Sequence, residues 1–158
     1  MSSSTPEQLW DLGSFLTSLR GAVGAEANTG DGAGILMAMP DAFMRATAGT
    51  DLPRAGRYAA GIAFLERDIT ASARQEQAIA AIVREEGLDV LAWRPVPVNP
   101  DGLGLQALAS MPGFKTLVVA APDATLAGLA LDRKAFRIRK RVEHEVRADG
   151  QWLGVRAR

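Results

Sequence analysis

The sequence predicts a single domain, residues 1-158, that mixes helices and strands. The first observation is its size, because 158 residues with 47% apolar content are enough to build one hydrophobic core. The second is that segments with the period of a helix take turns with short apolar or alternating segments that are typical of strands. The third is that the chain shows no internal repeat, low-complexity tract or domain linker. Periodicity alone leaves open whether the sheet is parallel or mixed.

The first helix is expected from Thr5 to about residue 19. Thr5 is a capping residue, Pro6 suits the first helical position, and Gln8 has the spacing of a capping box. Leucines at steps of three and four then form an apolar face. The stretch from Gly21 to Gly34 holds five glycines, a density that favours irregular backbone over helix or strand.

A buried strand is expected from Ile35 to Met39, where a short apolar run ends at Pro40. A short helix should follow Pro40, and Ala46 to Gly56 is typical of a loop. The segment from Tyr58 to Leu65 is predicted to be a strand, because large and small residues alternate along it. Another layer can approach its small-residue face closely, and that face consists of Ala59, Gly61 and Ala63.

The second half of the chain continues with a helix and a strand. Thr70 is expected to cap a helix that runs to about Glu86 and stops at Gly87. A strand is expected from Val90 to Val98. Two prolines in its second half cannot donate ladder hydrogen bonds, so this part should lie at an edge or leave the sheet.

Three further elements are predicted before the end of the chain. Leu105 to Met111 indicates a short helical turn, and Thr116 to Ala120 indicates a buried strand. The longest helix should run from about Ala124 to Val146, and Trp152 to Val155 should begin another strand. The apolar face of the longest helix consists of Leu131, Ala135, Ile138, Val142 and Val146.

Charge and hydropathy exclude several classes of partner. Eighteen basic and eighteen acidic residues cancel, so no global field attracts the protein to nucleic acid or to an anionic membrane. The first ten residues lack the basic and apolar regions of a signal peptide, and no stretch approaches the length of an apolar membrane span. We therefore expect a cytoplasmic protein that binds no nucleic acid and no membrane.

The content of cysteine and histidine excludes most catalytic constellations. Without cysteine the chain has no disulfide, thiolate metal site or cysteine nucleophile, and a single histidine, His144, provides no imidazole cluster for zinc. We therefore expect no metal site and no catalytic residue within this chain. His144 lies between two glutamates and is interpreted as a surface residue near a helix end. Glu26 and Asp31 are interpreted as turn and capping residues of the glycine-rich stretch instead of an acid–base pair.

Two motifs resemble ligand-binding sequences without meeting their requirements. The glycines from Gly30 to Gly34 precede a predicted strand, whereas a nucleotide-binding loop follows a strand, opens a helix and in P-loops includes a lysine. The basic stretch from Arg133 to Arg141 is bracketed by acidic residues, and the chain has one tyrosine for stacking on bases. We interpret this stretch as a solvated helix face.

Residues Arg20 to Ile35 read RGAVGAEANTGDGAGI, and they resemble the amino-terminal class II glutamine amidotransferase domain of the glutamate synthase large subunit. The resemblance covers nearly the whole chain. Similar segments follow in order at Pro40 to Arg45, Gly56 to Gly61, Phe64 to Leu65, Glu86 to Leu88, Trp93 to Val98, Met111 to Phe114 and Arg139 to Glu143. The resemblance implies an α+β fold of the Ntn-hydrolase type, a four-layer αββα sandwich. It is expected to be incomplete here, with the first strand and the C-terminal part of the domain missing.

The resemblance also implies a chemistry. In that family the thiolate of an N-terminal cysteine attacks the side-chain amide of glutamine, and its own α-amino group acts as the base. The nucleophilic cysteine and an Asn-Gly-Glu-like oxyanion segment are absent from this chain, and Leu19 replaces a histidine of the family. Arg20 is the one substrate-binding candidate, because the matching arginine lies close to the glutamine pocket in related amidotransferases. The FMN and iron–sulfur cluster of the family belong to regions absent from this chain, so no cofactor is expected here.

Three hypotheses follow from these observations. The leading one is a partial glutaminase domain of a glutamate synthase-like protein, related to glutamate biosynthesis, nitrogen metabolism and ammonia transfer from glutamine. It is expected to be inactive alone and to join the remaining glutamate synthase chain or to self-associate. The alternative is a non-catalytic binding or regulatory module with the same scaffold. The third is a free-standing glutaminase that uses Ser2, but Ser2 leads into a predicted helix and the oxyanion donors are missing. Whether the chain is itself an enzyme stays open.

Overall fold

The structure is a computed structural model, and it describes residues 37–123, 125–148, 151–152 and 155–157. The chain divides into two compact units. One includes Pro100–Ser110 and contains the short helix α4 (Leu105–Ser110), which confirms the helical turn predicted there. The other comprises Met37–Asn99 and Met111–Arg158 and carries the sheet. The predicted first helix and the glycine-rich stretch lie outside the described residues.

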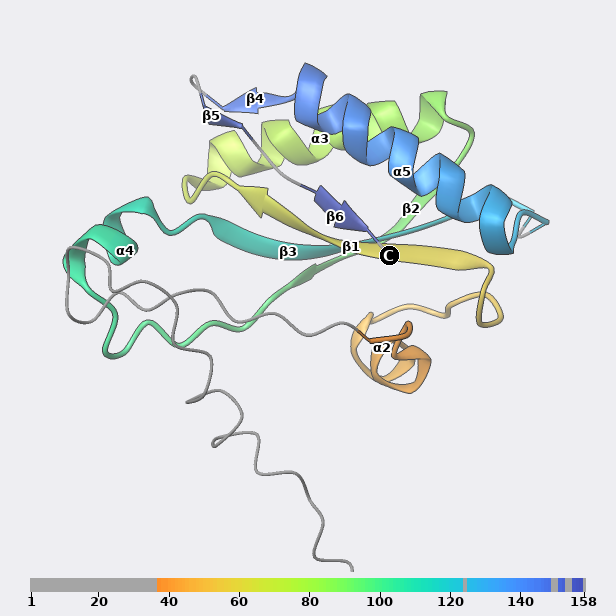
Figure 1. Ribbon diagram of the computed structural model, residues 1–158, viewed down its shortest axis with the longest axis horizontal. Coiled ribbons are helices and arrows are strands. Elements are labelled where there is room, and N and C mark those ends of the chain that lie inside the picture. Colours follow the sequence, from red (N-terminus) through yellow and green to blue (C-terminus); the bar gives the residue numbers. More distant parts are fainter. Residues whose placement is uncertain (1–36, 124, 149–150, 153–154, 158) are drawn as a thin grey trace, which may run out of the picture. The chain divides into compact units, whose positions relative to one another are not determined.

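The sheet has four antiparallel strands in the order β2-β3-β1-β6 (Figure 1). β1 and β3 pair along their whole length, from Tyr58 opposite Ala120 to Leu65 opposite Gly113. The antiparallel direction answers the question that periodicity left open. The strands are β1 (Tyr58–Leu65), β2 (Asp89–Pro95), β3 (Gly113–Ala120) and β6 (Val155–Ala157).

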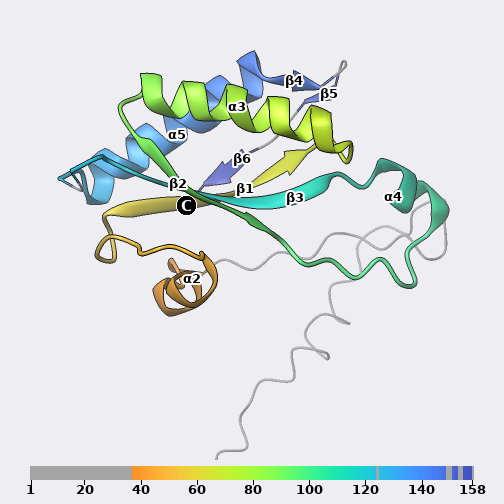
Figure 2. The same ribbon diagram turned by 180° about the vertical axis from the view of Figure 1, so that it is seen from behind.

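Helices lie against both faces of this sheet. The helices α3 (Ile69–Glu85) and α5 (Gly128–Glu145) cover one face, and α2 (Asp41–Thr47) lies on the other (Figures 1 and 2). The strands β4 (Arg147–Ala148) and β5 (Gln151–Trp152) pair as a small two-stranded sheet after α5. None of the helices in the described part of the chain combines the length and apolar character needed to cross a bilayer.

The alternation along β1 divides the apolar residues into one cluster on each face of the sheet. Ala59 and Ala63 belong to the larger cluster, together with buried residues of α3 and α5. The small-residue face predicted for this strand is therefore the face that the two helices cover. On the opposite face Tyr58 packs with Met44 of α2 and with Leu52.

The longest helix has the predicted apolar face but begins later than expected. Leu131, Ala135, Ile138 and Val142 are buried, in agreement with the three-to-four-residue spacing. α5 begins at Gly128, and Ala127 at its N-cap has an extended backbone and makes no side-chain cap hydrogen bond. Before the helix, the Oδ1 atom of Asp123 accepts hydrogen bonds from the backbone N–H of Thr125 at 3.1 Å and from the Thr125 hydroxyl at 2.7 Å.

The predicted strand from Ile35 to Met39 is wrong in its described part. Met37–Met39 form no strand, and the remaining two residues lie outside the described part. Met37 is 52% exposed, and the backbone N–H of Asp41 donates to the Met39 carbonyl at 2.9 Å as the chain turns into α2. An apolar run becomes a strand only where a neighbouring strand accepts its backbone hydrogen bonds.

The predicted cap of α3 is also wrong. The helix begins at Ile69, and the Oδ1 atom of Asp68 accepts a hydrogen bond from the Ala71 N–H at 2.8 Å. Asp68 has an extended backbone, with φ −65° and ψ 129°, as the N-cap position requires. Thr70 is therefore a residue of the first turn. Gly87 follows the helix at φ +75°, which confirms the predicted stop.

Two other predicted strands are confirmed with shifted bounds. β2 is an edge strand, as its prolines indicated, and it ends at Pro95. The Val96 N–H still donates to the Phe114 carbonyl at 2.9 Å, so the pairing with β3 extends one residue further. β3 begins at Gly113, before the predicted start at Thr116, and its last four residues are buried.

Candidate functional site

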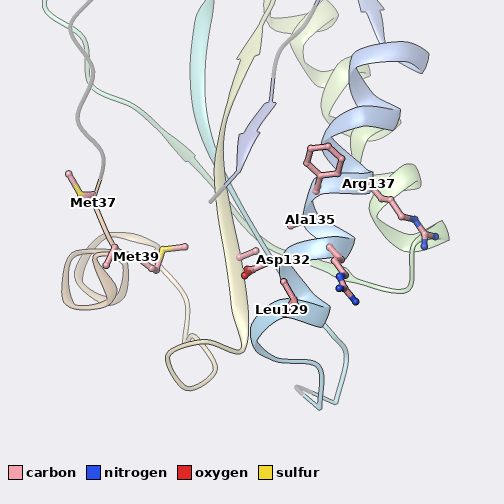
Figure 3. A pocket seen from close by; sticks show the side chains of 10 residues that line it. Met37, Met39, Leu129, Asp132, Ala135 and Arg137 are labelled. Atoms are coloured by element: carbon pink, nitrogen blue, oxygen red, sulfur yellow. The ribbon is translucent and has the colours of Figure 1, made fainter.

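An open pocket of about 900 Å³ lies beside Ala59 of β1. We call it the edge pocket. Its walls are Met37–Met39, which precede α2, and the first half of α5. Figure 3 shows Met37 and Met39 on one side of β1, with the labelled residues of α5 on the other.

The edge pocket presents mainly apolar surface. Met37 is 52% exposed, Leu129 64% and Phe136 54%, which is unusual for large apolar side chains that gather in one place. Charged residues also line it, but Arg137 extends away from β1 in Figure 3 and its Nη2 atom binds Glu86. An occupant would therefore meet apolar side chains, with charge confined to part of the α5 wall.

A hydrogen-bonded network attaches α2 to the sheet next to the edge pocket. The hydroxyl of Tyr58 donates to Asp41 Oδ1 at 2.8 Å. Arg45 binds the same carboxylate, with Nε donating to Oδ2 at 2.8 Å and Nη2 to Oδ1 at 3.1 Å. Arg45 also donates to the carbonyls of Leu52 and Pro53, which fixes the loop after α2. The network therefore positions the helix that directly follows Met37–Met39.

The environment of this network keeps each of its groups in one protonation state. Burial raises the pKa of Tyr58 to about 12, and its hydrogen bond to Asp41 acts in the same direction. The hydrogen bonds from Arg45 and then from Tyr58 lower the pKa of Asp41. At neutral pH Tyr58 is therefore a neutral donor and Asp41 an ionised acceptor. This is a structural arrangement, because Tyr58 is only 3% exposed and offers no route to a substrate.

A second polar cluster joins the end of α3 to α5, which forms one wall of the edge pocket. Glu86 is 7% exposed, and its carboxylate accepts hydrogen bonds from Arg137 Nη2 at 2.6 Å and Arg141 Nη1 at 3.2 Å. The Nζ atom of Lys134 donates to the Glu86 carbonyl. A buried carboxylate needs such partners, so the cluster fixes α5 relative to α3.

Acidic side chains pair with much of the basic stretch from Arg133 to Arg141. Arg141 also binds Glu145 and Glu85, and these bonds raise its pKa, with Glu145 having the larger effect. Lys140 and Arg139 pair with Glu143 and lower the pKa of that carboxyl, Lys140 having the larger effect. These ion pairs support the interpretation as a solvated helix face. That the protein binds no nucleic acid stays a prediction.

The residues singled out from the sequence are placed only in part. Arg20, Ser2, Glu26 and Asp31 lie outside the described residues, so their predicted roles stay predictions. His144 is exposed in the last turn of α5, as interpreted from its neighbours. The described residues contain no group of three or more histidine, cysteine, aspartate and glutamate side chains that could hold a metal ion.

Sequence reasoning missed the two polar networks and the edge pocket. Asp41 and Arg45 have the four-residue spacing of a helical ion pair, and a tyrosine in a buried strand needs a partner for its hydroxyl. These two signals together could have indicated the first network. Glu86 offers no local signal, because its carboxylate partners lie 51 and 55 residues away.

Comparison with known proteins identifies one family. The model of the family "Glutamine amidotransferases class-II" matches residues 13–154. Glutamate synthase (NADPH) large chain from Bacillus subtilis (strain 168) is 36% identical over 126 residues, 79% of this chain. Ferredoxin-dependent glutamate synthase 2 from Synechocystis sp. is 33% identical over 133 residues, 82% of this chain. The chain spans about 8% of the length of each of these two relatives.

Proposed function

This chain belongs to the class II glutamine amidotransferase family, and on that premise we propose that it forms part of the glutaminase of a glutamate synthase. The observation that carries the proposal is the family match over residues 13–154, together with relatives that are glutamate synthases. The reaction would be release of ammonia from the side-chain amide of glutamine, with glutamate as the other product. In this role the described sheet and helices serve as scaffold for the glutamine site.

Within this proposal the 158 residues do not turn over glutamine by themselves. The family resemblance implies a cysteine nucleophile, and the chain has no cysteine. Arg20 is the proposed contact to glutamine that remains in the chain. The nucleophile and the oxyanion donors would come from other polypeptide, in a longer form of the protein or in a partner chain such as the rest of a glutamate synthase. FMN and an iron–sulfur cluster would belong to that other polypeptide as well.

The complete fold in this proposal is the four-layer αββα sandwich of the Ntn hydrolases. The layer of α3 and α5 packed on an antiparallel sheet supplies one helix layer and one sheet layer of that arrangement. The second sheet and second helix layer would be added when the remaining polypeptide is present. A cytoplasmic location is part of the same proposal.

Incubation of the pure chain with glutamine tests the proposal that the chain alone does not turn over glutamine. We expect glutamate and ammonia to appear no faster than in buffer. Turnover that is lost in Ser2→Ala would instead establish Ser2 as an N-terminal nucleophile and contradict the proposal. The comparisons give no support to the alternative, a non-catalytic binding or regulatory module with the amidotransferase scaffold.

A further inference from the structure

A second pocket, of about 480 Å³, lies where β1 ends and β3 begins, and the first half of α3 borders it. We call it the α3 pocket. Its described lining residues all belong to the unit that carries the sheet. Apolar side chains form much of its wall, among them Leu65, Val98, Met111 and Phe114. A cavity of this size is typical of small-molecule sites, in which a few polar groups orient the ligand between apolar walls.

An ion pair on the wall of the α3 pocket supplies such polar groups. Lys115 of β3 donates from Nζ to Oε1 of Glu76 in α3, and the Ser72 hydroxyl donates to the same oxygen at 3.1 Å. The side chain of Lys115 is 31% exposed and that of Glu76 19%. Ser72 is buried. Two elements therefore hold the pair in one arrangement, which distinguishes it from a pair of mobile surface charges.

The ion pair has hydrogen-bonding capacity to spare. Within the residues that the structure describes, Glu76 Oε2 accepts no hydrogen bond, and Lys115 Nζ donates only to Glu76. The same residues contain no buried side-chain oxygen or nitrogen without a partner, so Oε2 is open to solvent. An ammonium group has three donor hydrogens, and two of them remain. The α3 pocket therefore offers an acceptor and donors close together.

The charges of the pair limit the chemical groups that fit beside it. A carboxylate would meet the negative charge of Glu76, and a cationic amine would meet the positive charge of Lys115. A primary carboxamide avoids both repulsions because it is neutral. It also carries a C=O acceptor and an N–H donor on one edge, which matches the donor and the acceptor of the pair.

We propose that the α3 pocket binds a small molecule that carries a primary carboxamide on an apolar body. The carboxamide oxygen accepts from Lys115 Nζ, its N–H donates to Glu76 Oε2, and the apolar body lies against Met111 and Phe114. Glutamine is outside this class, since its carboxamide is attached to a charged amino-acid group. The α3 pocket shares no described lining residue with the edge pocket, and the inference is independent of the proposed glutaminase activity.

Titration of the pure chain with benzamide, followed by proton–nitrogen NMR, tests this proposal. We expect the amide signals of Glu76, Gly113 and Lys115 to shift together, with a dissociation constant on the order of 1 mM, because so small a compound makes few contacts. Acetophenone has a methyl group in place of the amide nitrogen, and benzoate has a second oxygen there. Each should bind at least about tenfold more weakly, since one lacks the hydrogen bond to Glu76 and the other meets its negative charge.

Two variants separate the role of the ion pair from a general effect on folding. In Glu76→Gln a neutral amide replaces the acceptor, so benzamide binding should fall about tenfold while benzoate binding rises. Opposite changes for two probes are not expected from a loss of folding. Glu85→Gln is the matched control, because Glu85 is a 61% exposed residue of the same helix and does not line the α3 pocket. Both dissociation constants should stay unchanged in this variant.

Several results would overturn the proposal. If benzamide at millimolar concentrations shifts no signal of the α3 pocket, or shifts signals elsewhere more strongly, the pocket is not its site. Acetophenone binding as tight as that of benzamide would remove the role of the N–H group. Tighter binding of benzoate than of benzamide to the natural protein would contradict the argument from charge, and equal effects of Glu76→Gln and Glu85→Gln would remove Glu76 from the site.

Discussion

Tyr58 is the only tyrosine of the chain, and it connects the sheet to α2 through a single carboxylate. Its hydroxyl bond to Asp41 and the two bonds from Arg45 to the same carboxylate form one unit, in which each group depends on the others. A buried hydroxyl without an acceptor would raise the free energy of the folded protein, because it would have given up its hydrogen bonds to water for nothing. The bond to Asp41 therefore favours the observed position of α2.

Removal of the Tyr58 hydroxyl should destabilise the protein modestly. We expect Tyr58→Phe to lower the free energy of unfolding by about 1 kcal/mol, because one hydrogen bond to a charged group is lost while the partly exposed carboxylate regains water. Denaturant unfolding measures this change. In the Asp41→Ala background, which lacks the acceptor, the same substitution should cost less, and an equal cost in both backgrounds would show that the two residues do not interact.

The raised pKa of Tyr58 predicts a loss of stability at alkaline pH. In the unfolded chain a tyrosine titrates near pH 10, whereas in the folded protein its pKa is about 12. The contribution of the neutral hydroxyl is therefore fully present below about pH 10, and it is lost as the pH rises toward 12, because the unfolded chain releases its proton first. Unfolding free energies across this range should fall more steeply for the natural protein than for Tyr58→Phe. Parallel curves would contradict the assignment.

At the scale of the elements, local sequence signals located most helices and strands. β1 matches its predicted bounds, and the buried face of α5 has the predicted spacing, because a repeating apolar pattern survives small errors at the ends. The exact start of α3 depends on a single hydrogen bond. The Asp68 side chain caps this helix, although Thr70 could have served as the cap by residue type alone.

The cap of α3 gives a direct comparison of two candidate residues. We expect Asp68→Ala to lower the free energy of unfolding by about 1 kcal/mol, because the Ala71 N–H loses its acceptor. Thr70→Ala should change stability by less than about 0.5 kcal/mol, since it removes no cap and alanine favours a helix. Thermal or denaturant unfolding of both variants separates them, and the reverse order would restore Thr70 as the cap.

The junction between α3 and α5 gives a comparison of two adjacent glutamates. Glu86→Gln should lower the free energy of unfolding by about 1 to 2 kcal/mol, because a neutral amide would replace the buried carboxylate and its hydrogen bonds to two arginines would be weaker. The loss stays moderate because Arg137 is 66% exposed and can return to water. Glu85→Gln is the matched control, since Glu85 is 61% exposed and should contribute less than about 1 kcal/mol. Equal losses would show that the burial of Glu86 does not matter.

At the scale of the whole molecule, the sequence alone was enough to predict the family, but not the arrangement of residues around the edge pocket. The segments that resemble glutamate synthase are short and local, and the family match over residues 13–154 confirms them. The edge pocket unites residues from the segment before α2, from β1 and from α5, so it exists only after folding. Strand direction and the partners of Glu86 likewise depend on contacts between distant parts of the chain, which periodicity does not encode.

We propose that these 158 residues carry an amidotransferase scaffold without its nucleophile. The most direct test is the rate of glutamate and ammonia release when the pure chain is incubated with saturating glutamine. We predict no release above the buffer rate, because the chain has no cysteine to supply the thiolate. Turnover of about 1 per second or more, the range of ordinary enzymes, would contradict this account.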